Sequence, residues 1–349
     1  MALLVYGANG YTGTLVAERA AERGLPLVVA GRRQDEVVAL ARRLNVEHRV
    51  FALDDPAAID RGLAGAQVVL NCAGPFVRTA VPLAEACLRA RAHYLDVTGE
   101  IDAFAALFTR DAQARAAGVM LLPGAGFDVV PSDCLAAHVH QRLPGAIELR
   151  LAFRAGGGMS RGTALTSIEG AGHGGRIRKD GVLTRVPAGH RTIEVDFGRG
   201  PRKAIAIPWG DVFTAYVTTG IPRIEVYVAV PARLRIGLRL TRLLGPLLRA
   251  PAVQRRLKAR VSAGAPGPTA AERRAGKSLL WAEARDGSGA AATSRMEAPE
   301  GYELTRLTAV AIAERVLAGA APAGFQTPAL AFGKDFVLEF PGVRREDVG

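Results

Sequence analysis

Three glycines at regular spacing, close to the start of the chain, constrain the fold more than any other feature. They follow an apolar run from Ala2 to Tyr6 that has the length of a buried strand, and a helical pattern runs from Thr12 to Arg23. A strand, a glycine-rich turn and a helix in this order predict a βαβ unit whose turn binds the pyrophosphate of a dinucleotide; the alternative is a structural tight turn. The turn is the segment Gly7-Ala8-Asn9-Gly10-Tyr11-Thr12-Gly13.

The alternation of apolar strands and helices continues to residue 122. Unbroken apolar runs are typical of parallel strands that are covered on both faces. Together these elements predict an α/β fold with a doubly wound, Rossmann-type parallel sheet. The predicted strands are Ala2–Tyr6, Leu27–Ala30, Glu47–Phe51, Val68–Ala73, Tyr94–Val97 and Val119–Leu122.

The pattern changes after Pro123, where long stretches containing glycine separate the strand candidates. We expect a second α+β domain with a mixed or antiparallel sheet. The predicted division is 1–125 for the dinucleotide-binding domain, 126–300 for the substrate and dimerisation domain, and 301–349 for a C-terminal helix and segment. The strand candidates of the second domain are Ile147–Phe153, Thr192–Phe197, Ala204–Pro208, Ile224–Val230, Ser278–Ala284 and Ala291–Glu297.

The residues after the second strand indicate which dinucleotide is bound. NAD sites usually place Asp or Glu there to hold the ribose 2′-hydroxyl, whereas this chain has Gly31-Arg32-Arg33. A guanidinium pairs with a 2′-phosphate, so we predict NADP(H); the alternative is that one or both arginines are solvated charges. The residues after the fourth strand should also border the cofactor. The predicted cofactor-binding residues are Gly7, Asn9, Gly10, Tyr11, Thr12, Gly13, Arg32, Arg33, Asn71, Ala73, Gly74 and Pro75.

Carboxylates follow the fifth and sixth strands, at the edge of the sheet where a substrate would meet the cofactor. Hydride transfer needs a proton donor or an electrostatic stabiliser there. We predict Asp96, Glu100 and Ser132 as catalytic residues, with Asp128 and Asp133 beside them. The alternative for each is a structural role, as a helix cap or a loop brace.

Other polar residues have weaker claims to a role at the site. Tyr94 and Thr98 could donate hydrogen bonds to an enolate, and His93 is a candidate acid whose alternative is a packed structural residue. Four arginines could meet an anionic substrate, although each has the alternative of a solvated charge. They are Arg78, Arg154, Arg161 and Arg176.

A basic segment accounts for most of the net charge of +12. Nine Lys or Arg residues and no acidic one lie from Pro231 to Ser262, while the rest of the chain is nearly balanced, so we expect no nucleic-acid-binding surface. Leucines between the arginines predict helices over 232–261, broken near Gly245-Pro246 and Pro251. This segment could lie on an anionic membrane, receive an acidic acyl carrier protein, or cover apolar core with its arginine stems.

Together, these motifs resemble the saccharopine dehydrogenase-like oxidoreductases, within them the branch that includes the mycobacterial trans-acting enoyl reductases. The resemblance implies an NADP(H)-binding Rossmann domain, an α+β domain that closes over the substrate, and C-terminal helices that return to the first domain. It also implies a homodimer. The matching stretches are Gly7 to Gly13, Gly31 to Arg33, Asn71 to Phe76, His93 to Glu100, Gly126 to Asp133 and Thr327 to Gly333.

We therefore expect an NADP(H)-dependent oxidoreductase that reduces an enoyl or acyl thioester, or a related lipid intermediate. The alternatives are an amino-acid or imine reductase of the lysine-pathway kind and a non-catalytic NADPH-binding regulatory protein. The sequence lacks the Tyr-x-x-x-Lys pair of short-chain dehydrogenases and the H-E-x-x-H motif of zinc sites. Three widely spaced cysteines and no signal-peptide pattern lead us to expect a cytoplasmic protein. This protein could also associate with a membrane through the basic segment.

Overall fold

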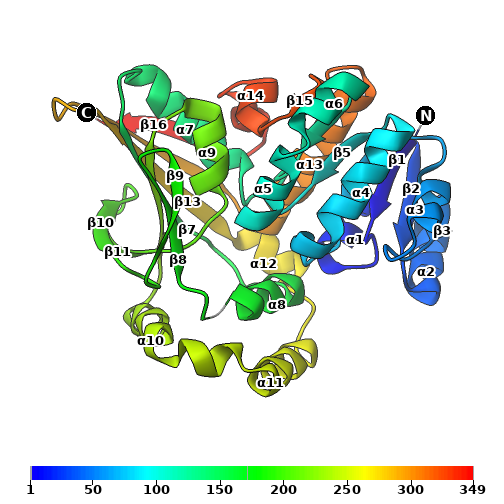
Figure 1. The fold of residues 1–349 in the computed structure, drawn as a ribbon, viewed down its shortest axis with the longest axis horizontal. Helices are drawn as coiled ribbons and strands as arrows, with labels where there is room; N and C mark the ends of the chain where they lie inside the picture. Colours follow the sequence, from blue (N-terminus) through cyan, green and yellow to red (C-terminus); the bar gives the residue numbers. More distant parts are fainter. Residues whose placement is uncertain (1, 171, 349) are drawn as a thin grey trace. The chain divides into compact units, whose positions relative to one another are not determined.

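The computed structural model describes residues 2–170 and 172–348. The chain forms two compact units, each built around its own sheet (Figure 1). Unit 1 contains Met1–Val130 and Tyr302–Ala331, and unit 2 contains Pro131–Gly301 and Phe332–Gly349.

Unit 1 is built on a parallel sheet of seven strands, which confirms the predicted doubly wound fold. The chain runs outward from β1 to β3 and then returns to β4 on the other side of β1. Ligands of such sheets bind at the carboxyl ends of the strands beside this reversal. In spatial order the strands are β15 (Gly324–Phe325), β6 (Met120–Leu122), β5 (His93–Asp96), β4 (Ala66–Asn71), β1 (Ala2–Tyr6), β2 (Leu27–Gly31) and β3 (Glu47–Val50).

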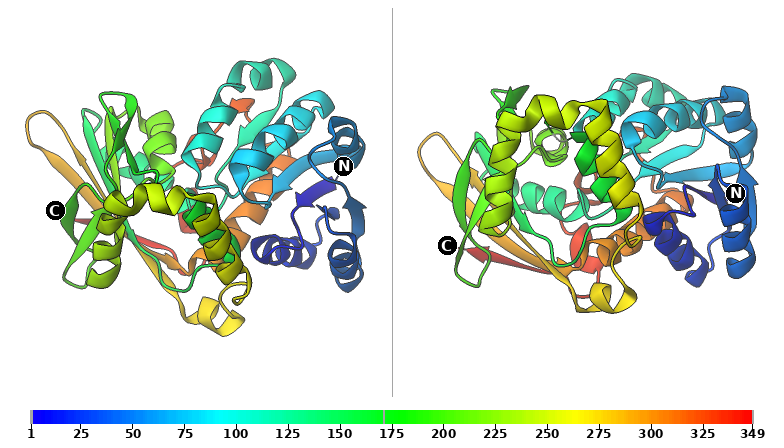
Figure 2. Two further views of the ribbon diagram at one scale, coloured as in Figure 1. Left: turned by 60° about the horizontal axis from the view of Figure 1, so that its bottom comes forward. Right: turned by 90° about the horizontal axis from the view of Figure 1, so that it is seen from below.

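Both faces of the centre of this sheet are covered. Successive residues of a strand point to opposite faces, and every residue of β2 is buried. Figure 2 shows the helices that flank the sheet. They are α1 (Tyr11–Glu22), α2 (Gln34–Leu44), α3 (Pro56–Leu63), α4 (Phe76–Ala90), α5 (Ile101–Phe108), α6 (Asp111–Ala117) and α13 (Gly301–Leu317), with α14 (Pro328–Phe332) at the passage to unit 2.

The segment 101–117 forms two helices, α5 and α6. Thr109 Oγ1 and Arg110 Nη1 each donate to the carbonyl oxygen of Ala106, at 2.7 Å in both cases. Side chains that bond to nearby carbonyls in this way compete with the continuing helix ladder, so the helix ends here and restarts.

Unit 2 is built on a mixed sheet of nine strands, in which β7 pairs with β12 in parallel and the other pairs are antiparallel. Tyr227, Trp281 and Phe197 lie in a buried apolar cluster on this sheet. The strands are β10 (Thr192–Asp196), β11 (Pro201–Ala206), β12 (Arg223–Ala229), β7 (Glu148–Arg154), β13 (Lys277–Arg285), β14 (Ala291–Pro299) and β16 (Arg344–Val348) along the main path. Beside this path, β8 (Gly175–Lys179) pairs with β12, and β9 (Val182–Val186) pairs with β8.

Helices of unit 2 include the basic segment singled out in the sequence. One predicted break in it is wrong, because α10 continues through Gly245 and Pro246. The residue before a proline is restricted mainly by its own Cβ, which glycine lacks, so Gly245 stays helical. The helices are α7 (Val130–Arg142), α8 (Arg161–Gly170), α9 (Asp211–Thr219), α10 (Ala232–Arg249), α11 (Pro251–Ser262) and α12 (Ala270–Ala275), with the short 3₁₀ helix η1 (Phe336–Glu339).

Two further properties concern the described ranges as a whole. Within 2–170 and 172–348, the helices contain no segment with the length and apolar character of a transmembrane span. In the same ranges, His, Cys, Asp and Glu residues form no group of three or more that could hold a metal ion.

Candidate cofactor-binding site

The turn after β1 requires glycine at two positions. Gly7 has a φ of +75°, and a Cβ added to it would lie 2.8 Å from the backbone nitrogen of Ala73. A Cβ on Gly13 would lie 2.2 Å from the carbonyl oxygen of Gly7. The Gly13 contact closes the turn on itself, and the Gly7 contact places the turn against the segment after β4. Both segments are predicted to hold the cofactor.

The N-terminus of α1 is open to an anion. Gly10 is its N-cap and supplies no side chain, and the first turn contains no acidic residue. The first N–H groups of a helix have no partner within it and carry a partial positive charge. A turn that only glycine fits, leading to an uncapped helix start, suits the pyrophosphate of a dinucleotide.

The two arginines after β2 differ in their surroundings. The Arg33 guanidinium forms an ion pair with Glu36 at 2.7 Å, and the same carboxylate accepts a hydrogen bond from Asn9 Nδ2 at 2.8 Å. Arg32 is exposed and forms no ion pair within the described part of the chain. Because the Arg33 charge is balanced by Glu36, Arg32 is the stronger candidate for a 2′-phosphate.

A buried hydrogen-bond network follows β4. Asn71 is fully buried, its Oδ1 accepts the backbone N–H of Ala73 at 2.9 Å, and its Nδ2 donates to Thr79 Oγ1 and to the Tyr94 hydroxyl. Thr79 Oγ1 also donates to the Ala73 carbonyl at 2.6 Å. These bonds fix the loop that includes Gly74 and Pro75, so Asn71 shapes the rim of the predicted site from inside.

Asp96 continues this network at the end of β5. Its Oδ2 accepts the Tyr94 hydroxyl at 2.8 Å, and its Oδ1 accepts the N–H groups of Thr98 and Gly124, both at 2.9 Å. Complete burial raises the pKa of Asp96 to about 7 and that of Tyr94 well above its usual value. All these contacts are internal, so they favour the loop-bracing alternative; the catalytic role of Asp96 stays a prediction.

Glu100 binds the start of a helix. Its Oε1 and Oε2 accept the backbone N–H groups of Phe76 and Val77, at 3.0 and 2.9 Å, which are the first residues of α4. The Glu100 backbone N–H donates to Thr98 Oγ1 at 3.0 Å. A carboxylate at a helix N-terminus satisfies orphan donors and interacts well with the helix dipole. This favours the capping alternative for Glu100, and its catalytic role also stays a prediction.

Asp128 is half-buried, like Glu100 and unlike the fully buried Asp96. It follows β6 and lies against Gly99, where an added Cβ would be 2.8 Å from the Asp128 Oδ2. Desolvation, and then the nearby charge of Glu100, raise the pKa of Asp128 to about 7. Asp128 can therefore exchange a proton near neutral pH.

His93 has a structural contact. The backbone N–H of Met120 donates to His93 Nδ1 at 3.0 Å, and burial lowers the pKa of the imidazole. A neutral ring that joins β5 to β6 agrees with the structural alternative for this residue.

The loop after β6 is held by two threonines that sequence reasoning missed. Thr305 Oγ1 accepts the N–H of Phe127 at 3.0 Å, and Thr308 Oγ1 donates to the carbonyl of Ala125 at 2.8 Å. Both threonines are buried on α13. Two hydroxyls three residues apart on the buried face of a long helix are the signal that could have found them, since buried hydroxyls need partners.

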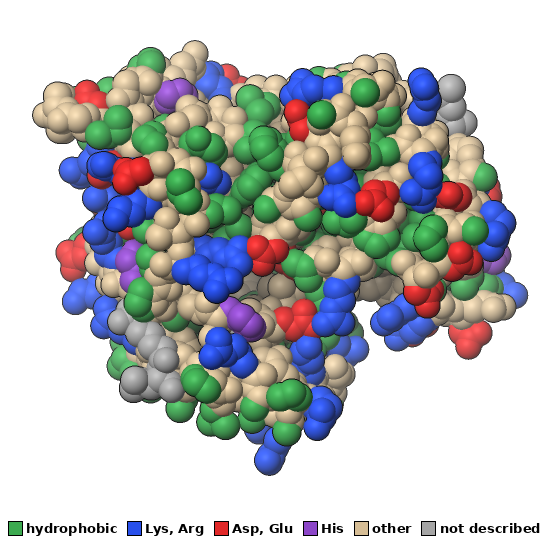
Figure 3. Space-filling view, viewed as in Figure 1, with side chains coloured by type: hydrophobic (Ala, Val, Ile, Leu, Met, Phe, Trp, Pro, Cys, Tyr) green, Lys and Arg blue, Asp and Glu red, His purple; other side chains and the backbone are tan. Residues whose placement is uncertain are grey.

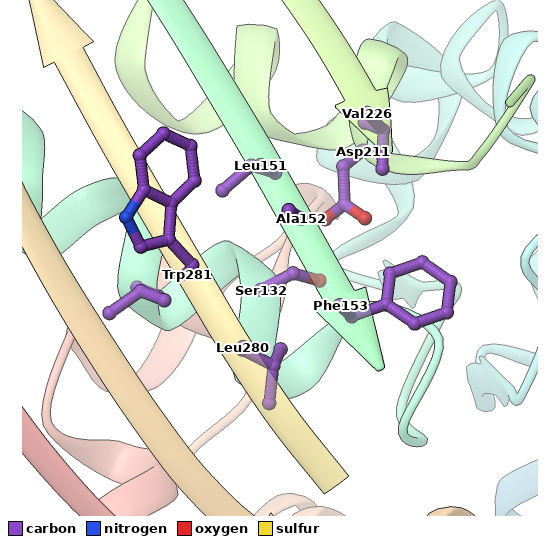
Figure 4. A pocket seen from close by; sticks show the side chains of 9 residues that line it. Ser132, Leu151, Ala152, Phe153, Asp211, Val226, Leu280 and Trp281 are labelled. Carbon is purple, nitrogen blue, oxygen red and sulfur yellow. The ribbon is translucent and has the colours of Figure 1, made fainter. Parts of the chain in front are cut away.

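Ser132 and Asp133 belong to unit 2. Ser132 is buried and, with Asp211, lines a cavity of about 10 Å³, which is the size of one water molecule (Figure 4). Asp133 accepts a hydrogen bond from Thr218 Oγ1 at 2.5 Å. The catalytic role of Ser132 stays a prediction, whereas Asp96, Glu100 and Asp128 lie together in unit 1.

A larger cavity in unit 2 is lined by cations. Its volume is about 140 Å³, and Arg154, Arg199 and Lys277 lie around it with Gly156 and Leu279. Lys277 and Arg199 share Glu297 at 2.5 and 3.4 Å, while Arg154 forms no ion pair within the described ranges. The cavity therefore retains positive charge, which suits an anionic group.

Comparisons with known proteins place the glycine turn in a known domain. Residues 3–122 match the family described as the saccharopine dehydrogenase NADP binding domain. This confirms the prediction of NADP(H) as the cofactor.

Individual relatives are similar over part of their length. The trans-acting enoyl reductase of Mycobacterium ulcerans (strain Agy99) is 30% identical over 153 residues, 40% of this chain and 35% of that protein. The saccharopine dehydrogenase-like oxidoreductase of Homo sapiens is 31% identical over 204 residues, 51% of this chain and 47% of that protein. The chain thus spans between about a third and a half of these relatives.

One solved structure has the same fold throughout. Apo saccharopine dehydrogenase (L-Glu forming) from Saccharomyces cerevisiae matches with a TM-score of 0.64 at 13% identity, over 99% of each chain. Residues 3–122 therefore match the saccharopine dehydrogenase NADP binding domain, about half of the chain is similar to a saccharopine dehydrogenase-like oxidoreductase, and the whole chain has the fold of the yeast enzyme.

Proposed function

We propose that this chain is an NADP(H)-dependent reductase of enoyl or acyl thioesters. The observation that carries the proposal is the glycine turn with its uncapped helix start, because it suits the pyrophosphate of the cofactor that the family binds. The thioester substrate is proposed from relatives named trans-acting enoyl reductase, which are 30 to 31% identical to part of this chain.

The residues of unit 1 divide into those that hold the cofactor and those that hold its loops. The turn from Gly7 to Gly13 and the start of α1 receive the pyrophosphate, and Arg32 pairs with the 2′-phosphate. Asn71, Asp96 and Glu100 keep the loops after β4 and β5 in place. When bound, NADPH supplies a hydride for the β-carbon of the substrate.

We assign Asp128 as the residue that supplies the proton. Hydride addition to an enoyl thioester leaves an enolate, which needs a proton at its α-carbon. Asp128 follows β6 at the carboxyl edge of the sheet, and burial and the charge of Glu100 raise its pKa to about 7. A general acid works best when its pKa lies near the working pH. Tyr94 and Thr98 are buried and engaged in internal hydrogen bonds.

A substrate panel tests the proposal. The full-length protein, saturated with NADPH, is mixed with 2-enoyl thioesters of several chain lengths, with ketones, and with mixtures of amino acids and 2-oxo acids. NADPH consumption is followed by its absorbance, and products are identified by mass. We expect a saturated thioester to form. Consumption confined to other substrates would contradict the thioester assignment, and binding without any turnover would favour a regulatory protein.

The cationic cavity of unit 2 favours one second candidate. Arg154, Arg199 and Lys277 suit the carboxylates of an amino-acid or imine substrate, as well as the phosphates of a carrier-bound thioester. The mixtures of amino acids and 2-oxo acids in the panel, run beside each component alone, separate these cases. Only an imine reductase consumes NADPH when both components are present but not with either component alone.

A further inference from the structure

Helix α10 presents an apolar stripe to solvent. Ile236, Leu240, Leu244 and Leu247 are 46 to 58% exposed. Their spacing places them within about 80° of arc on the helix, and the stripe is about 17 Å long. A helix that packs on a core normally turns such a stripe inward, so this orientation calls for a partner.

The opposite side of α10 is attached to unit 2, which fixes the rotation of the helix. Arg235 Nη1 donates to the carbonyl of Val230 at 2.7 Å, and Arg239 Nη2 donates to Thr192 Oγ1 on β10 at 2.8 Å. Gly245 is buried against Gly172. The stripe therefore faces outward because other sides of the helix are bonded to the rest of unit 2.

Exposed cations accompany the stripe. On α11, Gln254 Nε2 donates to the carbonyl of Ile168 at 2.8 Å and Lys258 pairs with Glu169 at 2.5 Å, so this side faces α8. Five arginines of α10 and α11 are exposed and form no ion pair within the described residues; they are Arg233, Arg249, Arg255, Arg256 and Arg260. Figure 3 shows apolar and basic side chains together over the region where Figure 1 places these two helices.

The charge excludes a second copy of the chain as the occupant. In a two-fold symmetric contact each patch faces its own copy, so these arginines would face arginines and repel. A partner helix usually binds in a groove between elements. The stripe stands on one helix, and the two cavities described above are lined by residues outside α10 and α11.

We propose that α10 and α11 form a docking surface for an anionic lipid membrane. Leucine and isoleucine side chains in line on α10, with exposed arginines on the same helix and on α11, suit helices that lie in the plane of a bilayer. The stripe enters the boundary between headgroups and acyl chains, and the arginines pair with anionic headgroups. This inference is independent of the reaction proposed above, since it depends only on unit 2.

Vesicle co-sedimentation tests the proposal. The full-length protein is mixed with vesicles of phosphatidylcholine alone and of phosphatidylcholine with 30% phosphatidylglycerol (a mixture chosen at roughly the order of anionic content at which basic segments bind). We expect binding to the anionic vesicles at least tenfold tighter than to the neutral ones, and weaker binding as NaCl rises because salt screens exposed charges. Equal or absent binding to both would overturn the proposal.

Two variants and their matched controls separate the contributions of stripe and charge. The stripe variant changes Ile236, Leu240, Leu244 and Leu247 to Ser, and its control changes the exposed residues Met159 and Val182 to Ser. The charge variant changes Arg255, Arg256 and Arg260 to Gln. Its control removes three exposed arginines that also form no ion pair in the described ranges, namely Arg42, Arg185 and Arg202.

The affinity of each variant for the anionic vesicles should be at least tenfold lower than that of the wild type. The affinity of each control should stay within twofold of the wild type. If the charge control lost as much vesicle binding as the charge variant, binding would depend on the net charge of the protein and not on α10 and α11. That result would overturn the proposal. A circular dichroism spectrum and a urea midpoint like those of the wild type show that unit 2 of each variant is folded, and neither measurement depends on the reaction. A stripe variant that turns a dimer into a monomer, or tight binding to an acidic acyl carrier protein without vesicle binding, would also overturn the lipid proposal.

Discussion

The Oε1 of Glu100 accepts the backbone N–H of Phe76 at 3.0 Å, although 24 residues separate them in the chain. This bond joins the loop after β5 to the first turn of α4. Asp96, four residues before Glu100, bonds in turn to the loop after β6. The carboxyl edge of the sheet is therefore a connected network, and the cofactor-binding loops share its stability.

Replacing Glu100 by Ala should lower the free energy of unfolding by about 1 to 2 kcal/mol, because two N–H groups at the start of α4 lose their acceptor. Urea unfolding measures this. Glu100→Gln retains one acceptor oxygen and should lose less. If Glu100→Gln unfolds like the wild type but turns over at least tenfold more slowly, Glu100 acts in catalysis and the capping account is incomplete.

The stability of the protein should fall as pH rises from about 4 to 7. Asp96 has a pKa of about 7 in the folded protein against 3.8 for the ordinary carboxyl, so the folded state binds more protons in this window. At one pKa unit per roughly 1.4 kcal/mol, ionised Asp96 costs on the order of a few kcal/mol. Urea midpoints at several pH values should show a smaller slope for Asp96→Asn. An equal slope in both proteins would contradict the assignment.

Gly13→Ala should abolish NADPH binding. The new Cβ would lie 2.2 Å from the Gly7 carbonyl oxygen and 2.8 Å from the Ala8 Cα, and both are backbone atoms that cannot rotate away. The turn must shift, which we expect to cost about 1 to 3 kcal/mol of stability. Gly145→Ala is the control, since an added Cβ there meets nothing within 4 Å. Wild-type NADPH affinity in Gly13→Ala would refute the close fit of this turn.

Asp128→Asn should lower kcat at least tenfold if Asp128 supplies the proton. In the wild type, kcat should fall as pH rises through about 7, because the protonated carboxyl is the active form. That limb of the pH profile should be absent in the variant. A reduced kcat with the limb still present would assign the proton to another group, although NADPH affinity should be unchanged in either case.

Arg154→Gln should raise KM for an anionic substrate by about tenfold and leave NADPH affinity unchanged. Arg154 lines the cationic cavity and has no competing carboxylate among the described residues, so its charge is available to the substrate. Arg185→Gln, another exposed arginine of unit 2, serves as the control. An unchanged KM in Arg154→Gln would remove the cavity from the substrate site.

The sequence predicts the elements that local patterns specify. The strands over Ala2–Tyr6 and at Leu27 are confirmed because buried parallel strands appear as unbroken apolar runs. The two-residue strand β15 is too short to show a pattern, and β8 is missed because three of its five residues are basic. The strand β9 is missed although it contains two valines and a leucine, and none of its residues is buried.

The same distinction between local and long-range features applies to the candidate site. The glycine turn is local and can be recognised from spacing, whereas the role of Glu100 depends on Phe76 and that of Thr305 depends on Phe127, 178 residues away. Hydrogen bonds across such separations leave no periodicity in one sequence. The outward rotation of α10 is equally hidden, because it depends on which of its faces finds a partner in unit 2.

The most direct test of the account is a calorimetric titration of the protein with NADPH and with NADH. We expect NADPH to bind at least tenfold more tightly. Arg32→Gln should remove most of this preference and Arg33→Gln less, because the Arg33 charge is already balanced by Glu36. Equal affinity for the two cofactors, or a preference that survives the loss of both arginines, would contradict the account.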